Sequence, residues 1–207
     1  MKNQPILYGI IGLLAGSLIA VLFVTNTVNT NNVGMMQMMG IRQGTNGSLT
    51  ANNLDKHFIE QMIPHHEGAI EMAKLAQERS KRPEILTLAK AIIQSQSKEI
   101  TQMQAWYKNW YGSEVPVNST VGMGMGRGMM HGGMMGGKTS DLESLKNATN
   151  FDEAFLQEMI PHHQMAVMMA QMLLSGTDRS EMKKLGQDII TAQEVEIEQM
   201  RTWLRDW

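Results

Sequence analysis

Two pairs of adjacent histidines are the residues of this sequence best suited to bind a metal ion. Each pair follows a Met-Ile-Pro tripeptide, so that His65-His66 and His162-His163 stand in the same local sequence. Methionines occur three residues before and seven residues after the first histidine of each pair, at Met62, Met72, Met159 and Met169. Imidazole and thioether together suit soft ions such as Cu(I). The pattern predicts a soft-metal site, although for a lone histidine a buried hydrogen bond would be the simpler interpretation.

The two histidine pairs belong to a repeat with a constant offset of 97 residues. From Phe58 to Trp110, 21 of 53 positions are identical to the residue 97 positions later, without any gap. Gapless identity over such a span is typical of one structural unit used twice. Within each unit, apolar residues recur every three or four positions in two segments, as expected of two amphipathic helices. Pro83 occupies a favoured first-turn position for the second of these helices.

Two such hairpins bury their apolar faces best against each other, so the sequence predicts an all-α fold. The expected architecture is an antiparallel four-helix bundle built from two duplicated helical hairpins. Residues 51–111 form the first hairpin repeat in this interpretation, and residues 150–207 form the second. Between them, residues 112–149 are a Gly/Met/His-rich segment, which we expect to be flexible because dense glycine is costly to order.

An uncharged apolar run from Ile6 to Val24 precedes the repeats. Its length is close to what a helix needs to cross a hydrocarbon core of ~30 Å. Residues 1–25 are therefore predicted to be a membrane anchor in the inner membrane or a cleaved signal segment, and residues 26–50 a Met-containing flexible linker. Because Lys2 is the only charge before the run, we expect the remainder to be exported to the periplasmic side, either anchored or secreted.

The composition excludes several classes of protein and of functional site. The chain has 207 residues with 18 basic and 20 acidic side chains, which excludes a nucleic-acid-binding protein that depends on bulk positive charge. It has no cysteine, which excludes disulfides, zinc fingers and thiol catalysis. Neither the Glu-x-x-His of di-iron bundles nor a His-Glu-x-x-His motif occurs. With 21 methionines, any sulfur ligand must be a thioether.

The second helix of each unit carries polar residues within its apolar stripe. Glutamine, glutamate and methionine recur there at the same offset, as Gln96, Glu99 and Met103 and as Gln193, Glu196 and Met200. A buried carboxylate is costly unless it is paired. Glu99 and Glu196 thus either form Glu–His pairs that fix the helix register, or orient ligating imidazoles from behind, or both.

Many methionines have no evident use in a core. Seven potential ligands lie in the glycine-rich segment, namely Met123, Met125, Met129, Met130, His131, Met134 and Met135. Four more methionines follow the apolar run, and Met165, Met168 and Met172 are expected on the outer face of the third bundle helix. Methionines on the inner stripes could serve as core filler. The others indicate thioether-based binding of Cu(I), with Ag(I) as its chemical analogue.

Both halves resemble the DUF 305 family. The resemblance rests on Phe58, Met62 to His66, Ala69, Met72 and Ala73, on their counterparts from Phe155 to Ala170, and on the Gln-x-x-Glu-Ile-x-x-Met-x-x-Trp pattern of each second helix. It covers about residues 55–111 and 152–207. A duplicated form with a Met-rich segment is similar to periplasmic copper-binding proteins of that family. The resemblance implies a ferritin-like four-helix fold and a role in copper and silver tolerance.

The sequence therefore predicts an exported copper-binding protein that sequesters Cu(I) or hands it on to a partner not yet known. The bundle ligands would be Met62, His65, His66, Met72 and Met103 with Met159, His162, His163, Met169 and Met200, and the Gly/Met/His-rich segment would capture metal quickly and with low specificity. We expect no enzymatic activity. The alternatives are a copper-dependent redox enzyme that oxidises Cu(I), and a metal-free, membrane-anchored helical adaptor whose histidines are core residues.

Overall fold

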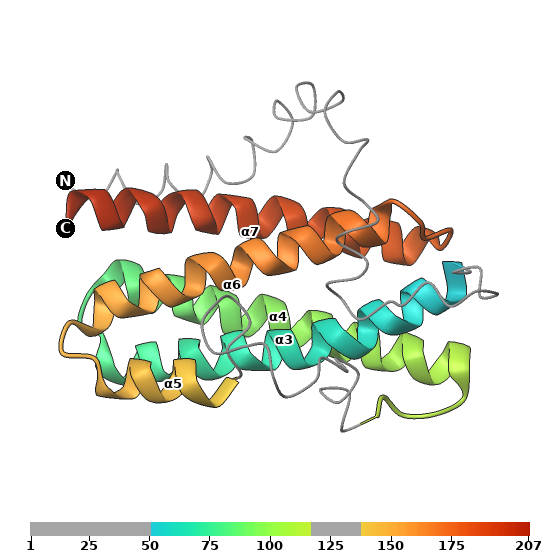
Figure 1. Cartoon of the computed structure of the whole chain (residues 1–207), viewed down its shortest axis with the longest axis horizontal. Helices are drawn as coiled ribbons and strands as arrows, with labels where there is room; N and C mark the ends of the chain where they lie inside the picture. The colour runs from blue at the N-terminus through green and yellow to red at the C-terminus, as the bar shows by residue number, and fades with distance from the viewer. Residues whose placement is uncertain (1–50, 117–137) are drawn as a thin grey trace, which may run out of the picture. The chain divides into compact units, whose positions relative to one another are not determined.

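The computed structural model describes residues 51–116 and 138–207, and these residues form five α-helices. In chain order they are α3 (Ala51–Arg79), α4 (Pro83–Tyr111), α5 (Lys138–Asn147), α6 (Phe151–Leu174) and α7 (Ser180–Asp206) (Figure 1). The predicted all-α fold is confirmed. Within these described ranges, no helix is long and apolar enough to cross a membrane. The predicted anchor or signal segment at 1–25 and the linker at 26–50 lie outside the described residues.

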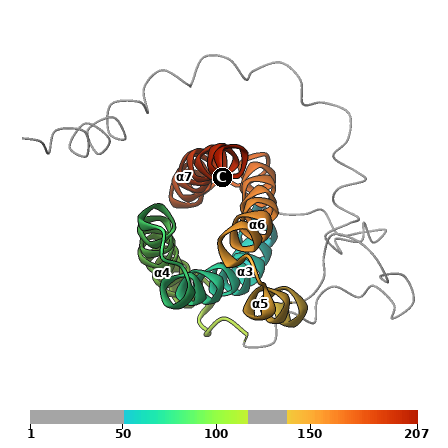
Figure 2. The same cartoon turned by 90° about the vertical axis from the view of Figure 1, so that its left-hand side faces the viewer.

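The four long helices pack as two hairpins, as the repeat predicts. Helix α3 packs along α4, helix α6 packs along α7, and the two hairpins meet through α3 and α6 (Figure 2). Because the hairpins are copies of one unit, this packing relates them by an approximate two-fold axis between α3 and α6. Residues 97 positions apart therefore occupy equivalent places, and a residue near the middle of α3 lies close to its own counterpart in α6.

Local sequence explains where the helices begin and end. Pro83 is the first residue of α4, where its missing N–H costs no hydrogen bond. Gly112 ends α4 with φ of 69°, a left-handed conformation that glycine adopts without strain, and its N–H donates to the Lys108 carbonyl at 3.0 Å. Helices α3 and α6 both continue through an internal proline, Pro64 and Pro161.

A large core cluster joins both hairpins. Ile85, Ile92, Phe155 and Leu156 are fully buried in it, at 0% exposure. Burying one such side chain stabilises the fold by roughly 1.5–3 kcal/mol. The same cluster includes Ala69 and Ala73 of α3 and Val167 of α6, so the helix segments that follow the histidine pairs are held by packing.

Helix α5 is a departure from the sequence-based expectation, which made all of residues 112–149 a flexible segment. The helix packs against α3 and α6 and inserts Leu145, which is 1% exposed, into the core cluster. Arg79 at the end of α3 donates hydrogen bonds to the carbonyls of Leu145, Lys146 and Ala148. A helix of this length is marginal alone, so tertiary contacts that composition does not reveal stabilise it.

Candidate metal centre

Four imidazoles form a continuous series across the contact between the two hairpins, which we call the imidazole row (His66, His65, His162 and His163). His65 and His162 lie at its centre, with ring centroids 3.8 Å apart and ring planes inclined by 40°. The centroid of His66 lies 6.5 Å from that of His65, and the centroid of His163 lies 6.4 Å from that of His162. The row is symmetric about the two-fold axis, so each hairpin supplies half of it.

A glutamate holds each end of the imidazole row. Nε2 of His66 lies 2.6 Å from a carboxylate oxygen of Glu99, and Nε2 of His163 lies 2.7 Å from one of Glu196. A carboxylate only accepts hydrogen bonds, so Nε2 of each ring donates to its glutamate, and in the neutral form of the ring Nδ1 then has a lone pair. The predicted Glu–His pairing is thus present, and it joins α3 to α4 and α6 to α7.

The lone pairs of the outer imidazoles are buried. His66 and His163 are both 0% exposed, and Nδ1 of each has no hydrogen-bond partner among the described residues. Leaving such an acceptor without a partner costs about 1–3 kcal/mol. A carboxylate behind one ring nitrogen and a free lone pair on the other is the arrangement found around metal-ligating histidines. His65 and His162 are only partly buried, which leaves the centre of the row closer to solvent.

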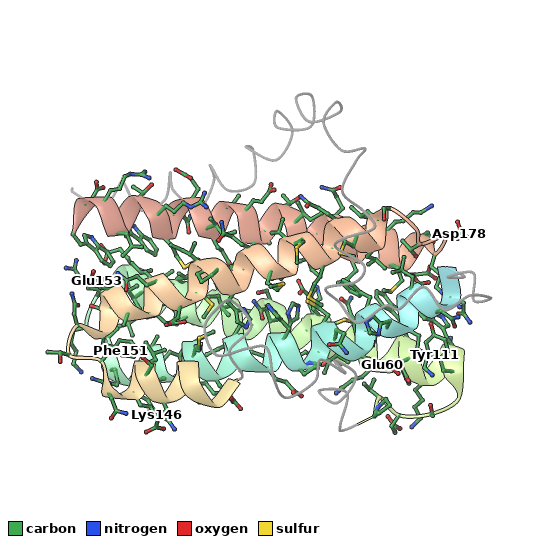
Figure 3. The ribbon with its side chains drawn as sticks, viewed as in Figure 1. Glu60, Tyr111, Lys146, Phe151, Glu153 and Asp178 are labelled. Carbon is green, nitrogen blue, oxygen red and sulfur yellow. The ribbon has the colours of Figure 1, made fainter. Side chains whose placement is uncertain are left out.

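The six paired methionines of the bundle are buried and divide into two sets. Met72, Met159 and Met200 belong to the core cluster described above. Their counterparts at the offset of 97, which are Met169, Met62 and Met103, are equally buried but lie outside that cluster. Each set takes two thioethers from one hairpin and one from the other. Figure 3 shows sulfur atoms between the helices along much of the bundle.

Gln96 and Gln193 are also buried in the interior, at 2% and 4% exposure. The side-chain oxygen of each has no hydrogen-bond partner within the described residues. Each glutamine lies three residues before the glutamate that holds a histidine, on the same helix face. The interior around the imidazole row therefore contains polar atoms that form no hydrogen bond with the part of the chain that the structure describes.

Two symmetric contacts that were not predicted from the sequence hold the hairpins in register. Arg179 contacts Asp55 at 3.2 Å and lies 4.1 Å above the Trp110 ring, while Arg82 contacts Asp152 at 3.4 Å and lies 3.8 Å above the Trp207 ring. In Figure 3, Tyr111 and Asp178, the neighbours of Trp110 and Arg179, lie at the same end of the bundle. The identity of each arginine and aspartate at the offset of 97 was the signal available.

Asp55 is more buried than its counterpart, with a side chain 1% exposed against 20% for Asp152. Burial raises the pKa of the Asp55 carboxyl above its ordinary value, and hydrogen bonding to Thr177 and the charge of Arg179 oppose this effect. The two arginine–aspartate contacts therefore differ in how far the carboxylate is buried.

The donor set fits a soft metal ion and does not fit a hard one. Among the described residues, no group of three or more His, Cys, Asp and Glu side chains could hold a metal. The buried interior of the bundle instead contains imidazoles and thioethers, since His66 and His163 and the six paired methionines are all buried. Imidazole with thioether favours Cu(I) and Ag(I), whereas Mg²⁺ and Ca²⁺ require clustered oxygen ligands.

Some predicted site residues lie elsewhere. The seven potential ligands of the glycine-rich segment, from Met123 to Met135, lie outside the described residues, as do the four methionines after the apolar run. Met165, Met168 and Met172 were expected on an exposed outer face, but all three are partly buried. Their side chains are therefore not fully exposed to solvent.

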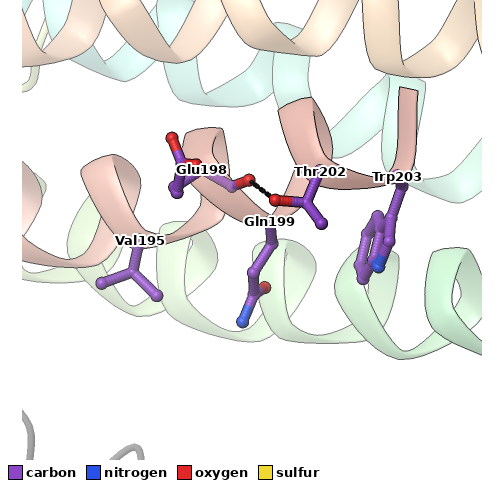
Figure 4. A pocket seen from close by; sticks show the side chains of 5 residues that line it. All are labelled: Val195, Glu198, Gln199, Thr202 and Trp203. Atoms are coloured by element: carbon purple, nitrogen blue, oxygen red, sulfur yellow. Dashed lines mark hydrogen bonds between the residues drawn. The ribbon is translucent and has the colours of Figure 1, made fainter. Parts of the chain in front are cut away.

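A shallow depression on α7 is unrelated to the imidazole row. It encloses ≈ 360 Å³ and is lined by Val195, Glu198, Gln199, Thr202 and Trp203. Figure 4 shows these side chains on one stretch of the helix, where the Thr202 hydroxyl donates to the Glu198 carbonyl at 2.9 Å. Its lining includes neither histidine nor methionine, so it offers no soft ligand.

Comparison with known proteins identifies related chains. A family model described as "Domain of unknown function (DUF305)" matches residues 55–204. Crystal structures of CopM in Cu(II)-bound and Cu(I)-bound forms are 42% and 43% identical, cover 74% of this chain and 98% and 96% of CopM, and superpose with a TM-score of 0.62. CopM has also been solved with bound silver.

More distant relatives share the fold or part of the sequence. A DUF305 protein from Streptomyces coelicolor, described as a candidate secreted protein, is 26% identical over 76% of this chain and 93% of that one, with a TM-score of 0.61. Protein L153 of Acanthamoeba polyphaga mimivirus is 47% identical over 51 residues, which are 25% of this chain. The chain spans 34% of the length of that curated relative.

Proposed function

The chain belongs to the DUF305 family, and on that premise we propose that it is an exported protein that binds Cu(I) and either sequesters the ion or hands it on. Ag(I) would bind as a chemical analogue. The observation that carries the proposal is the imidazole row, in which two glutamates hold the outer rings while the buried Nδ1 atom of each has no hydrogen-bond partner among residues 51–116 and 138–207. CopM, whose structures contain copper or silver, supports the choice of metal.

The proposed bundle ligands come from both hairpins. His65 and His162 lie closest together at the two-fold axis and are the most accessible rings of the row. The two methionine sets would supply thioethers on either side, and Glu99 and Glu196 would keep His66 and His163 in the tautomer that presents Nδ1. The segment from Met123 to Met135 would act as a capture arm that delivers metal to the bundle.

A competition titration tests this function. The full chain is titrated with Cu(I) against a chromophoric chelator, beside a His65→Ala/His162→Ala variant and a Gln164→Ala control, in which an exposed neighbour of His163 is changed. We expect the double variant to lose the tightest binding and the control to keep it. Retention of the tightest binding by the double variant would show that the row is not the copper site.

The same proposal makes the protein a binder and not an oxidase. Sequestration or transfer ends when the sites are full, whereas Cu(I) oxidation consumes oxygen with turnover. Oxygen uptake by the full chain is measured as Cu(I) is added beyond the number of sites. We expect no uptake above that of free Cu(I), and sustained uptake would favour the redox alternative.

A further inference from the structure

The α3–α6 pair has an outer face that α5 covers only in part. Figure 2 shows α5 on the side of this pair that faces away from α4 and α7. Arg79 ties α5 to the C-terminal end of α3, and the cation–π contact of Arg79 with Phe151 at 5.0 Å places the first residue of α6 at the same end. The two-fold-related half of the outer face consists of the N-terminal half of α3 and the C-terminal half of α6.

The two halves of the outer face differ at four positions that could supply soft ligands. The half beneath α5 carries Gly68, Glu71, Leu75 and Ala154, and the equivalent positions of the other half carry Met165, Met168, Met172 and His57. Leu75 and Ala154 pack against the core cluster to which Leu145 of α5 belongs. At each of these four positions, the half that is equivalent to the one under α5 carries a thioether or an imidazole.

Two contacts set the register of this half. His65 and His162 are level at the centre, and Leu54 lies so close to Gly176 that a Cβ there would be 2.9 Å from Leu54 Cδ2. In this antiparallel pair, residue numbers rise along α3 while they fall along α6. If His65 lies opposite His162, His57 lies opposite residue 170 of α6; if Leu54 lies opposite Gly176, His57 lies opposite residue 173. Met172 therefore lies within one helical turn of the level of His57.

The direction of the side chains agrees with this register. Successive side chains of an α-helix are rotated by about 100° around the helix axis. The direction of His57 therefore differs from that of His65 by about 80°, and the direction of Met172 differs from that of His162 by about 80° in the same rotational sense. Under a two-fold axis between the helices, equal rotations place both side chains on the same outer side of the pair. Met168 lies one turn before Met172 on the same helix and neighbours it.

The chemistry of this cluster fits a soft cation. Nε2 of His57 is buried and has no hydrogen-bond partner among the described residues, although the side chain as a whole is only partly buried. Met168 and Met172 are partly buried as well. One imidazole and two thioethers are a donor set for a monovalent soft ion. A ligand bound to Nε2 would offset the cost of burying that nitrogen without a partner.

We propose that His57, Met168 and Met172 form a second, asymmetric site for Cu(I) or Ag(I) on the outer face of the α3–α6 pair, separate from the imidazole row. Met165 continues the methionine stripe from this site toward His162 and would extend the path between the two. The repeat duplicated the central site, and this outer site would be an addition to one half only.

The test uses the full chain with ¹³C-labelled methionine methyl groups and Ag(I) as a redox-inert probe. The repeat itself supplies mild substitutions: His57→Ala introduces the residue found at Ala154, and Met172→Leu the residue found at Leu75. Met182→Leu, in the core of α7, is the control for thioether loss elsewhere. We expect the methyl signals of Met168 and Met172 to shift together as Ag(I) is added. In His57→Ala, the Ag(I) concentration that produces the same shifts should be at least about tenfold higher than in the wild-type chain.

The His65→Ala/His162→Ala variant separates this proposal from the proposed function. If the outer site exists independently, the Met168 and Met172 signals still respond to Ag(I) in that variant, whether or not the row binds metal. Unchanged silver response of these two methyl groups in His57→Ala would overturn the proposal, as would no response of either group in the wild-type chain. In both cases the methionines would serve only to cover apolar surface.

Discussion

Replacement of Glu196 separates a structural role of the Glu–His pairs from a metal-orienting one. Glu196→Ala removes the acceptor that Glu196 provides for Nε2 of His163, a side chain that is 0% exposed. A buried donor without an acceptor costs about 1–3 kcal/mol of unfolding free energy. For a domain of this size, each kcal/mol lowers Tm by roughly 2–4 °C. We therefore expect the metal-free variant to melt measurably earlier than the wild-type protein.

The affinity for metal should fall as well. Loss of the group that orients a ligating histidine typically costs about 10–100-fold in metal affinity. Glu196→Gln keeps an acceptor oxygen for Nε2, so its metal-free stability should lie close to that of the wild type and its affinity between the two. Glu194→Ala, on the exposed side of the same helix, is the matched control and should change neither quantity.

The assay combines thermal unfolding of the metal-free chains with Ag(I) competition titrations. The reasoning would be refuted if Glu196→Ala lowered Tm as expected but bound silver with wild-type affinity. In that case the pair would fix the register of α6 against α7 and contribute nothing to a metal site.

Three further predictions concern stability. Arg179→Ala leaves the buried Asp55 carboxylate without its partner and should cost about 3 kcal/mol, more than Arg82→Ala, whose aspartate is more exposed; denaturant unfolding of both variants checks the order. Burial raises the Asp55 pKa from 3.8, so the folded state holds this proton at a pH where the unfolded state has lost it. The stability of wild type relative to Asp55→Asn should therefore rise as pH falls through the folded pKa toward 3.8, and a constant difference between pH 7 and pH 4 would contradict this. Leu145→Ala should cost about 2–5 kcal/mol if α5 is part of the cooperative core, and an unchanged denaturation midpoint would show that it is not.

The repeat allowed most of the fold to be predicted from the sequence. The constant offset predicted two equivalent hairpins, and the spacing of apolar residues predicted their inner faces, as α3, α4, α6 and α7 show. Helix α5 was missed because its ten residues carry few apolar positions: Leu145 is buried in the core cluster, and Leu142 packs against it. Short helices that depend on tertiary contact leave little trace in composition.

The candidate site could be predicted from the sequence only in part. Helical spacing indicated that both histidines of each pair lie on the inner arc and that Glu99 and Glu196 face them. It could not indicate that His65 meets His162 while His66 and His163 meet glutamates, because that depends on how α3 crosses α6. The roles of Arg82 and Arg179 were missed for a related reason: their partners lie in the other hairpin, far away in sequence.

The signals of the histidine ring nitrogens report directly on whether the imidazole row binds the metal. The full chain is labelled with ¹⁵N, and the ring signals of His65 and His162 are followed as Ag(I) is added. We predict that both rings shift together during the first equivalents and that the shifts are complete before silver saturates the chain. Ring signals of His65 and His162 that stay unchanged until saturation would contradict the account.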